Sequence, residues 1–172
     1  MINNKNNRNN KNNKNNKKSI IIFTDGACSS NGKCTAKGGI GVHFPGLEFN
    51  DISKKFTEIP ITNQRAELCA IQEALDTVIT DQTIDKITIY SDSTYSIKSL
   101  TEWIKNWEKN GWKSANGKPV KNLDLIQPIY RTLKAHKNKV NFIHVKAHTG
   151  GSSFEATGND KADKLATSGV LL

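Results

Sequence analysis

Ser19-Ile20-Ile21-Ile22-Phe23-Thr24-Asp25 is the segment from which the architecture of this 172-residue chain can be worked out. Its apolar run, 20–23, is too short for a helix and rich in β-branched side chains, which is typical of a central strand buried on both faces. Asp25 follows this run directly. Because residues just past strand ends often line the ligand crevice of an α/β sheet, Asp25 is a candidate functional residue, although a turn former is the plainer interpretation.

Strand and helix patterns alternate along the rest of the chain. Besides 20–23, we expect strands at 39–44, 49–56, 86–90 and 140–145. We expect helices at 62–78, with Thr62 as its cap, 95–107, 123–136 and 159–168, and a polar, basic loop at 105–121. An opening meander followed by alternating helices and strands predicts an α/β fold, with a mixed five-stranded sheet (antiparallel meander plus parallel strands) flanked by helices.

The first residues have a different composition from the rest. Residues 3–18 contain only Asn, Lys and Arg and carry six positive charges, which account for most of the net charge of +9. Such a segment cannot bury apolar surface, so we expect residues 1–18 to be a disordered tail and residues 19–172 to form one domain. The tail is either a sequence-independent electrostatic arm for phosphates or a compositional feature without a selected role, and its simple repeat favours the second interpretation.

Several protein classes are excluded by what the sequence lacks. The three cysteines, Cys28, Cys34 and Cys69, are odd in number and form no C-x-x-C pair, which argues against a disulfide framework and a structural zinc site. No apolar run is long enough to span a membrane, and no hydrophobic signal core is present, so we expect an intracellular protein, cytoplasmic or nuclear. There is also no H-E-x-x-H motif, phosphate-binding loop or G-x-S-x-G elbow.

Three further acids have positions that suggest a site. Asp92 follows the expected strand 86–90, where it could also be a helix cap. Glu67 lies on the helix face that should approach the sheet, and a buried carboxylate needs a cationic partner or a metal ion. Asp163 is flanked by Ala162, Leu165 and Ala166 in the last helix. Four converging acids would suit Mg²⁺, but spacing alone leaves this metal site and scattered caps or surface acids as equal alternatives.

Four short motifs in order resemble those of type 1 ribonuclease H, over nearly all of residues 19–170. They are Thr24-Asp25-Gly26-Ala27-Cys28-Ser29-Ser30-Asn31-Gly32 (continued by Gly39-Ile40-Gly41-Val42), Thr62-Asn63-Gln64-Arg65-Ala66-Glu67, Tyr90-Ser91-Asp92-Ser93 and Gly158-Asn159-Asp160-Lys161-Ala162-Asp163. The resemblance implies a ribonuclease H-like fold and a catalytic domain at 19–172. It also implies sequence-independent endonucleolytic hydrolysis of the RNA strand of RNA–DNA hybrids, leaving 5′-phosphate and 3′-hydroxyl ends.

The resemblance also assigns catalytic roles. Two Mg²⁺ ions, with Mn²⁺ able to replace them, would be held by Asp25, Glu67, Asp92 and Asp163 and would activate the attacking water. Asp163 is preferred over Asp160 because the last acid of the motif follows an alanine. His148 matches a histidine that helps proton transfer or product release.

Residues that would contact the hybrid follow from the same resemblance, with a single monomeric chain as the expected binder. Those expected at the minor groove and the sugars, where the 2′-hydroxyl distinguishes RNA, are Asn31, Asn63 and Gln64. Those expected to hold a DNA phosphate are Thr62 and Asn122. Those of the basic protrusion are Trp103, Trp107 and Trp112, with Lys105, Lys109, Lys113, Lys118 and Lys121. We expect at least one tryptophan to lie against the DNA backbone and the others to be core residues.

One segment departs from the family pattern, and rival functions stay open. Residues 149–158 separate His148 from Asn159 by more than in many family members, and we expect this longer loop to make His148 more mobile. The rivals are an integrase-like or resolvase-like enzyme on the same fold, a non-catalytic hybrid-binding module, and a plain basic nucleic-acid-binding domain. The last would leave a buried-face Glu67 unexplained.

Overall fold

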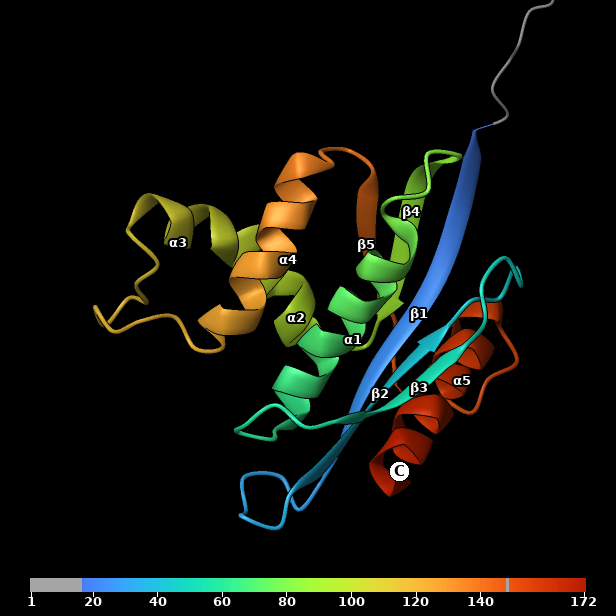
Figure 1. Ribbon diagram of the computed structural model, residues 1–172, viewed down its shortest axis with the longest axis horizontal. Coiled ribbons are helices and arrows are strands. Elements are labelled where there is room, and N and C mark those ends of the chain that lie inside the picture. Colours follow the sequence, from blue (N-terminus) through green and yellow to red (C-terminus); the bar gives the residue numbers. More distant parts are fainter. Residues whose placement is uncertain (1–16, 148) are drawn as a thin grey trace, which may run out of the picture.

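A mixed five-stranded sheet forms the centre of the molecule in the computed structural model, which describes residues 17–147 and 149–172 (Figure 1). Its strands are β1 (Lys18–Ser29), β2 (Lys37–His43), β3 (Ile52–Phe56), β4 (Ile84–Ser91) and β5 (Val140–His144). In space they follow the order β3-β2-β1-β4-β5. The first three are antiparallel, and β4 and β5 run parallel to β1, which confirms the predicted mixed sheet.

Helices cover both faces of the sheet. They are α1 (Asn63–Val78), α2 (Thr94–Lys98), the π-helical turn η1 (Ser99–Trp103), α3 (Ile104–Lys109), α4 (Leu123–Ala135) and α5 (Phe154–Leu171). Helices α1 to α4 lie on one side of the sheet, and α5 lies on the other, across β1, β2 and β3 (Figure 1). None of the helices within the described residues has both the length and the apolar character needed to cross a membrane.

The two sides of β1 explain this layering. Ile20 and Ile22 point into the main core, where they pack with Leu68, Ile71 and Leu75 of α1, all fully or almost fully buried. The alternate side chains of the same strand face α5, since successive residues of a strand point to opposite faces. Burying large aliphatic side chains of this kind contributes about 1.5–3 kcal/mol each relative to exposure.

Two glycines of β2 set how closely α5 approaches the sheet. A Cβ atom at Gly39 would stand 2.1 Å from the carbonyl oxygen of Ala166, and one at Gly41 would stand 2.2 Å from that of Ala162. Only glycine leaves room for the helix backbone here. The small residues Ala162 and Ala166 complete the close contact. The distance between α5 and the sheet, and with it the position of Asp163, is therefore fixed by β2.

The first strand is longer than predicted. β1 continues to Ser29, so Asp25 lies inside the strand, opposite Gly41, and the expectation that it follows the strand end was wrong. The reason is the pairing pattern: β4 accompanies β1 only as far as the pair Phe23–Tyr90, and beyond it β1 pairs with β2 alone. The apolar run therefore covers the part of β1 that pairs with β4, and it ends at Phe23, where β2 takes over as the partner. The strand also begins at Lys18, one residue inside the expected tail; residues 1–16 lie outside the described part of the chain.

Two predicted helices also differ from those observed. The helix expected at 95–107 consists of α2, the π-helical turn and α3, and α3 continues to Lys109, so the loop begins at 110 and not at 105. The last helix begins at Phe154 and not at 159. Ser153 caps it by accepting a hydrogen bond from the backbone N–H of Ala156 at 3.2 Å. Much of the long loop expected at 149–158 is therefore helical, and the predicted extra loop length was wrong for 154–158.

Candidate active site

Three of the four predicted acids meet at one point of the molecule. Carboxylate oxygens of Asp25, Glu67 and Asp92 lie within 4.8 Å of one another. They come from β1, from α1 and from the residue directly after β4. Asp163 of α5 lines the same open cavity, of about 570 Å³, together with these three. The structure thus brings all four acids to one cavity, three as a tight group and Asp163 on its wall.

Glu67 reaches this point because α1 begins beside β1. Thr62 caps the helix, as predicted, by accepting a hydrogen bond from the backbone N–H of Arg65 at 3.4 Å. Gly26 allows the close approach, since a Cβ atom there would stand 2.2 Å from the backbone nitrogen of Glu67. The result is a glutamate only 5% exposed.

Asp92 is held by two other elements. Asn159 of α5 donates a hydrogen bond from Nδ2 to Oδ2 of Asp92 at 3.1 Å. His144 lies behind the same turn, with Nε2 3.2 Å from the carbonyl oxygen of Asp92 and 3.1 Å from Oγ1 of Thr94. The alternative interpretation of Asp92 as a helix cap was wrong: Ser93 caps α2 by accepting a hydrogen bond from the N–H of Ser96 at 3.3 Å.

The electrostatics of the cluster disfavour three negative charges. Burial, followed by the charges of Asp25 and Asp92, raises the pKa of Glu67 well above its ordinary value. Burial, followed by the charges of Asp92 and Asp163, raises the pKa of Asp25 to about 7. Within the described residues no lysine or arginine pairs with any of these acids, and Oε2 of Glu67 is buried without a hydrogen-bond partner.

This arrangement fits a hard divalent cation. Mg²⁺ and Mn²⁺ prefer carboxylate oxygens, and a cation among these acids would offset the burial and the mutual repulsion that raise the pKa values of Asp25 and Glu67. It would also give the orphaned oxygen of Glu67 a partner. The scattered caps and surface acids that spacing alone left open do not describe these side chains.

Of the predicted minor-groove residues, Asn63 lines the cavity, and it is joined by a hydrogen bond to Asn31. The backbone N–H of Asn63 donates to Oδ1 of Asn31 at 3.2 Å, and Nδ2 of Asn63 donates to Oε1 of Glu67 at 3.4 Å. Gln64 accepts a hydrogen bond from Nζ of Lys121 at 3.1 Å. The first turn of α1 is therefore joined to the acid cluster on one side and to the end of the basic loop on the other.

Asn122 and the tryptophans form a second group. Asn122 is buried in a left-handed backbone conformation (φ 58°), and its Nδ2 donates to the hydroxyl of Tyr95 at 3.0 Å. The Tyr95 ring contacts Trp103, whose ring centroid lies 5.8 Å from that of Trp107. Trp103 is exposed (38%), whereas Trp107 and Trp112 pack against the core. The lysines predicted here, Lys105, Lys109 and Lys113, are exposed.

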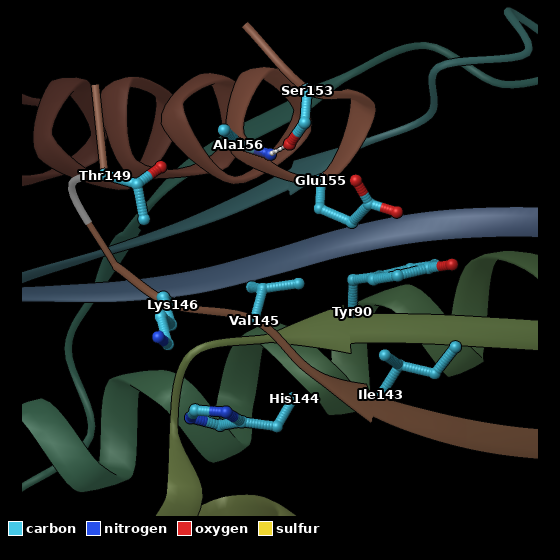
Figure 2. A pocket seen from close by; sticks show the side chains of 9 residues that line it. All are labelled: Tyr90, Ile143, His144, Val145, Lys146, Thr149, Ser153, Glu155 and Ala156. Atoms are coloured by element: carbon cyan, nitrogen blue, oxygen red, sulfur yellow. Dashed lines mark hydrogen bonds between the residues drawn. The ribbon is translucent and has the colours of Figure 1, made fainter. Parts of the chain in front are cut away.

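A second cavity, of about 450 Å³, lies between the ends of β4 and β5 and the first turn of α5 (Figure 2). Tyr90, His144, Lys146 and Glu155 are among its lining residues, and none of the four acids is. Figure 2 also shows the Ser153 cap of α5 at its edge. His148, for which a catalytic role was predicted, lies outside the described residues.

Asn159 stands in the fourth motif, but no role was predicted for it from the sequence. Its place in that motif and its position four residues before Asp163, on the same face of a helix, were the available signals. Its contact with Asp92 joins residues 67 positions apart, and such a contact depends on packing that local patterns do not encode.

Comparisons with known proteins agree with this geometry. The sequence model of the RNase H family matches residues 17–171. The chain is 40% identical over 155 residues to "Ribonuclease H" of Rhodopseudomonas palustris (strain BisB5), covering 89% of this chain and 93% of that protein. It is 41% identical over 142 residues to "Probable ribonuclease H" of Acanthamoeba polyphaga mimivirus, covering 80% of this chain but only 60% of that longer protein. Among solved structures, the RNase H domain of PFV, a foamy virus, superimposes with a TM-score of 0.72 at 26% identity, covering 90% of this chain and 96% of that one.

Proposed function

The chain belongs to the RNase H family, and from this premise we propose that it is an endonuclease that hydrolyses the RNA strand of RNA–DNA hybrids. The observation that carries the proposal is the buried cluster of Asp25, Glu67 and Asp92, with Asp163 on the wall of the same cavity. All these acids belong to one chain, so we propose that a monomer is sufficient. Cleavage would be independent of sequence and would leave 5′-phosphate and 3′-hydroxyl ends.

We further propose that the four acids hold two Mg²⁺ ions, which Mn²⁺ can replace. The support is the short separation of the carboxylate oxygens, the raised pKa values of Asp25 and Glu67, and the partnerless Oε2 of Glu67. When bound, such ions activate a water molecule for attack and stabilise the leaving oxygen of a phosphodiester. By resemblance, His148 would move a proton during turnover or help the product leave.

The residues beside the cavity suggest how the RNA strand of the hybrid is bound. Asn63 is tied both to Asn31 and to Glu67, so a sugar contacted by these amides would lie next to the acids. Amide groups can both donate to and accept from a 2′-hydroxyl, which is the group that distinguishes RNA from DNA. Gln64 would join them at the minor groove.

The DNA strand would be held farther along the same side. Thr62 and Asn122 are proposed to hold a DNA phosphate. Trp103, as the exposed tryptophan, is proposed to lie against the DNA backbone. Trp107 would support it from the core. The exposed lysines proposed to attract phosphates are Lys105, Lys109 and Lys113.

The test is a cleavage assay on end-labelled RNA–DNA hybrid, RNA duplex and DNA duplex, each with Mg²⁺ and with a chelator. We expect cutting of the hybrid alone, dependent on metal, with products that a ligase requiring 5′-phosphate and 3′-hydroxyl ends can rejoin. Asp92→Asn should lose at least about 100-fold in rate and still bind the hybrid. Asp160→Asn is the control for loss of an acid, because Asp160 of α5 does not line the cavity.

The same assay separates the rival functions. Binding of the hybrid without cutting would indicate a non-catalytic module, and cutting of the DNA duplex would indicate an integrase-like or resolvase-like enzyme. Full activity of Asp92→Asn would contradict the mechanism while leaving the hybrid specificity intact.

A further inference from the structure

Asn159 is a buried polar residue that touches the acid cluster from the far side of the sheet. It is 1% exposed, and its Nδ2 donates to Oδ2 of Asp92 at 3.1 Å. Its Oδ1 is buried and has no hydrogen-bond partner within the described residues. Burying an amide costs free energy unless its polar atoms are hydrogen-bonded. Asn159 is therefore only partly compensated, because Asp92 pairs with its Nδ2 while its Oδ1 stays unpaired.

The packing beneath Asn159 fixes the geometry of this contact. A Cβ atom at Gly158 would stand 2.3 Å from the Phe23 ring, so the glycine lets α5 lie directly on that ring. Phe23 stacks on Tyr90 with centroids 4.8 Å apart, and Phe154 contacts both rings, at 5.4 and 6.4 Å. Figure 2 shows Tyr90 of β4 beside the first turn of α5. Asp92 follows Tyr90 by two residues, so donor and acceptor are anchored on the same aromatic group.

The position of Asn159 along α5 is equally specific. Asn159 and Asp163 are four residues apart and share one face of the helix. One turn of α5 therefore presents a neutral donor to Asp92, and the next presents a carboxylate to the same cavity. A lysine or arginine in place of Asn159 would neutralise Asp92 and compete with a cation, whereas an amide orients the carboxylate without changing the charge of the site.

We propose that Asn159 is a positioning residue: by holding Oδ2 of Asp92 it sets the rotation of that carboxylate, so that Oδ1 is free to serve as a metal ligand. This inference rests on the proposed function, because it assigns Asp92 to the metal site. A positioning role for Asn159 can be distinguished from a simple packing role. A packing residue contributes to folding, whereas a positioning residue contributes to metal affinity and to the rate of the chemical step.

The experiment measures Mn²⁺ binding by isothermal titration calorimetry in the absence of nucleic acid, and then kcat and KM on the hybrid. Asn159→Ala and Asn159→Asp both remove the donor, the first without adding a charge. We expect each to weaken Mn²⁺ binding by about 10- to 100-fold and to lower kcat to a similar degree, as removal of a hydrogen bond to a metal ligand commonly does. The KM for hybrid should stay within about twofold of wild type, since Asn159 does not line the cavity. Raising the Mn²⁺ concentration should restore part of the lost kcat.

A double-mutant cycle keeps the proposal falsifiable if Asn159→Ala lowers stability. If Asn159 acts through Asp92, adding Asn159→Ala to Asp92→Asn should cause no further loss of Mn²⁺ affinity. Losses that simply add, or wild-type Mn²⁺ affinity in both single variants, would overturn the proposal. Because metal binding is measured without substrate, this result is separate from the cleavage assay: a wild-type chain that failed to cut hybrids would refute the proposed function but not the role of Asn159.

Discussion

At the scale of single residues, Asp25 and Glu67 are the clearest sign that the site is built for a cation. Both are buried, and the pKa of each carboxyl is raised, first by burial and then by neighbouring negative charge. Ionising either of them without a cation costs folding free energy. A purely structural site would more often hold such groups with an arginine or with backbone N–H groups.

This cost should be visible as a dependence of stability on pH. The pKa of Asp25 is raised from 3.8 to about 7 in the folded chain, so between these values the unfolded chain has already lost the proton that the folded chain retains. Stability measured in chelator should therefore fall as pH rises from about 4 to 7, and stay low above that. Asp25→Asn removes the ionisable group and should raise the unfolding free energy at pH 8 by up to about 4 kcal/mol, because the shift of about 3 pKa units corresponds to about 1.4 kcal/mol per unit.

Urea denaturation at pH 5 and pH 8, with chelator present, measures this effect. Asp160→Asn is again the control, because it removes an acid of α5 that lies outside the cavity. A wild-type chain that is as stable at pH 8 as at pH 5, together with an Asp25→Asn variant no more stable than wild type, would contradict the prediction.

The identities of the four acids could be read from the sequence, but their geometry could not. Ordered motifs named Asp25, Glu67, Asp92 and Asp163, and the structure brings all four to one cavity. No motif indicated that three of them form a tight group while the fourth lies on the wall. Asn159 belongs to the fourth motif, but its role was missed, because its contact with Asp92 depends on how closely α5 packs on Phe23, and tertiary packing decides that distance.

At the scale of elements, α5 links the fold to the site. Its close approach depends on glycines on both sides of the contact, at Gly39 and Gly41 of β2 and at Gly158 of the helix itself. The register of α5 determines which of its residues reach the cavity. A small displacement of this helix would therefore move Asn159 and Asp163 together.

Gly158→Ala tests this dependence. The added methyl group would lie 2.3 Å from the Phe23 ring, which is stacked on Tyr90 and cannot move away freely. We expect a loss of about 1–3 kcal/mol in unfolding free energy from overpacking, despite the higher helix propensity of alanine. We also expect weaker Mn²⁺ binding, because the helix must shift outward.

Thermal denaturation and calorimetry with Mn²⁺ provide the two measurements. Gly151→Ala is a suitable control, since a Cβ atom there would meet no atom closer than 3.5 Å. A Gly158→Ala variant with unchanged stability and metal affinity would show that α5 can adjust without disturbing the site.

Element boundaries were predicted well where local chemistry determines them. Thr62 was recognised as a cap and does cap α1. The strand β1 was cut short because the apolar run covers only the part that pairs with β4, whereas the strand continues beyond Phe23 with β2 as its partner. The beginning of α5 was missed although Ser153 is a local cap; the first turn, from Phe154, also contacts Phe23 and Tyr90, residues distant in sequence.

At the scale of the whole molecule, positive charge is concentrated at one end of the chain. The described domain begins at Lys17, whose Nζ pairs with Asp85 at 2.8 Å, so this lysine is already engaged by the domain. Four other positive charges, Lys5, Arg8, Lys11 and Lys14, precede it. Cations attract nucleic-acid phosphates whether or not the segment that carries them has a selected role.

Deleting residues 2–16 tests what these charges contribute. The expected result is weaker hybrid binding at 50 mM salt, with a dependence of log Kd on log salt that is shallower by up to about 3.6, since each phosphate contact contributes about 0.9 to the slope for B-form DNA. The kcat at saturating hybrid should not change, because all four acids belong to the domain. Fluorescence anisotropy with labelled hybrid across a salt series measures the slope. Replacing the four cations with Gln in the 172-residue chain is the matched control for length, and it should weaken hybrid binding as much as the deletion does. Equal binding of the hybrid at low salt by the wild-type, deleted and Gln-substituted chains would refute an electrostatic arm and leave the tail as a compositional feature.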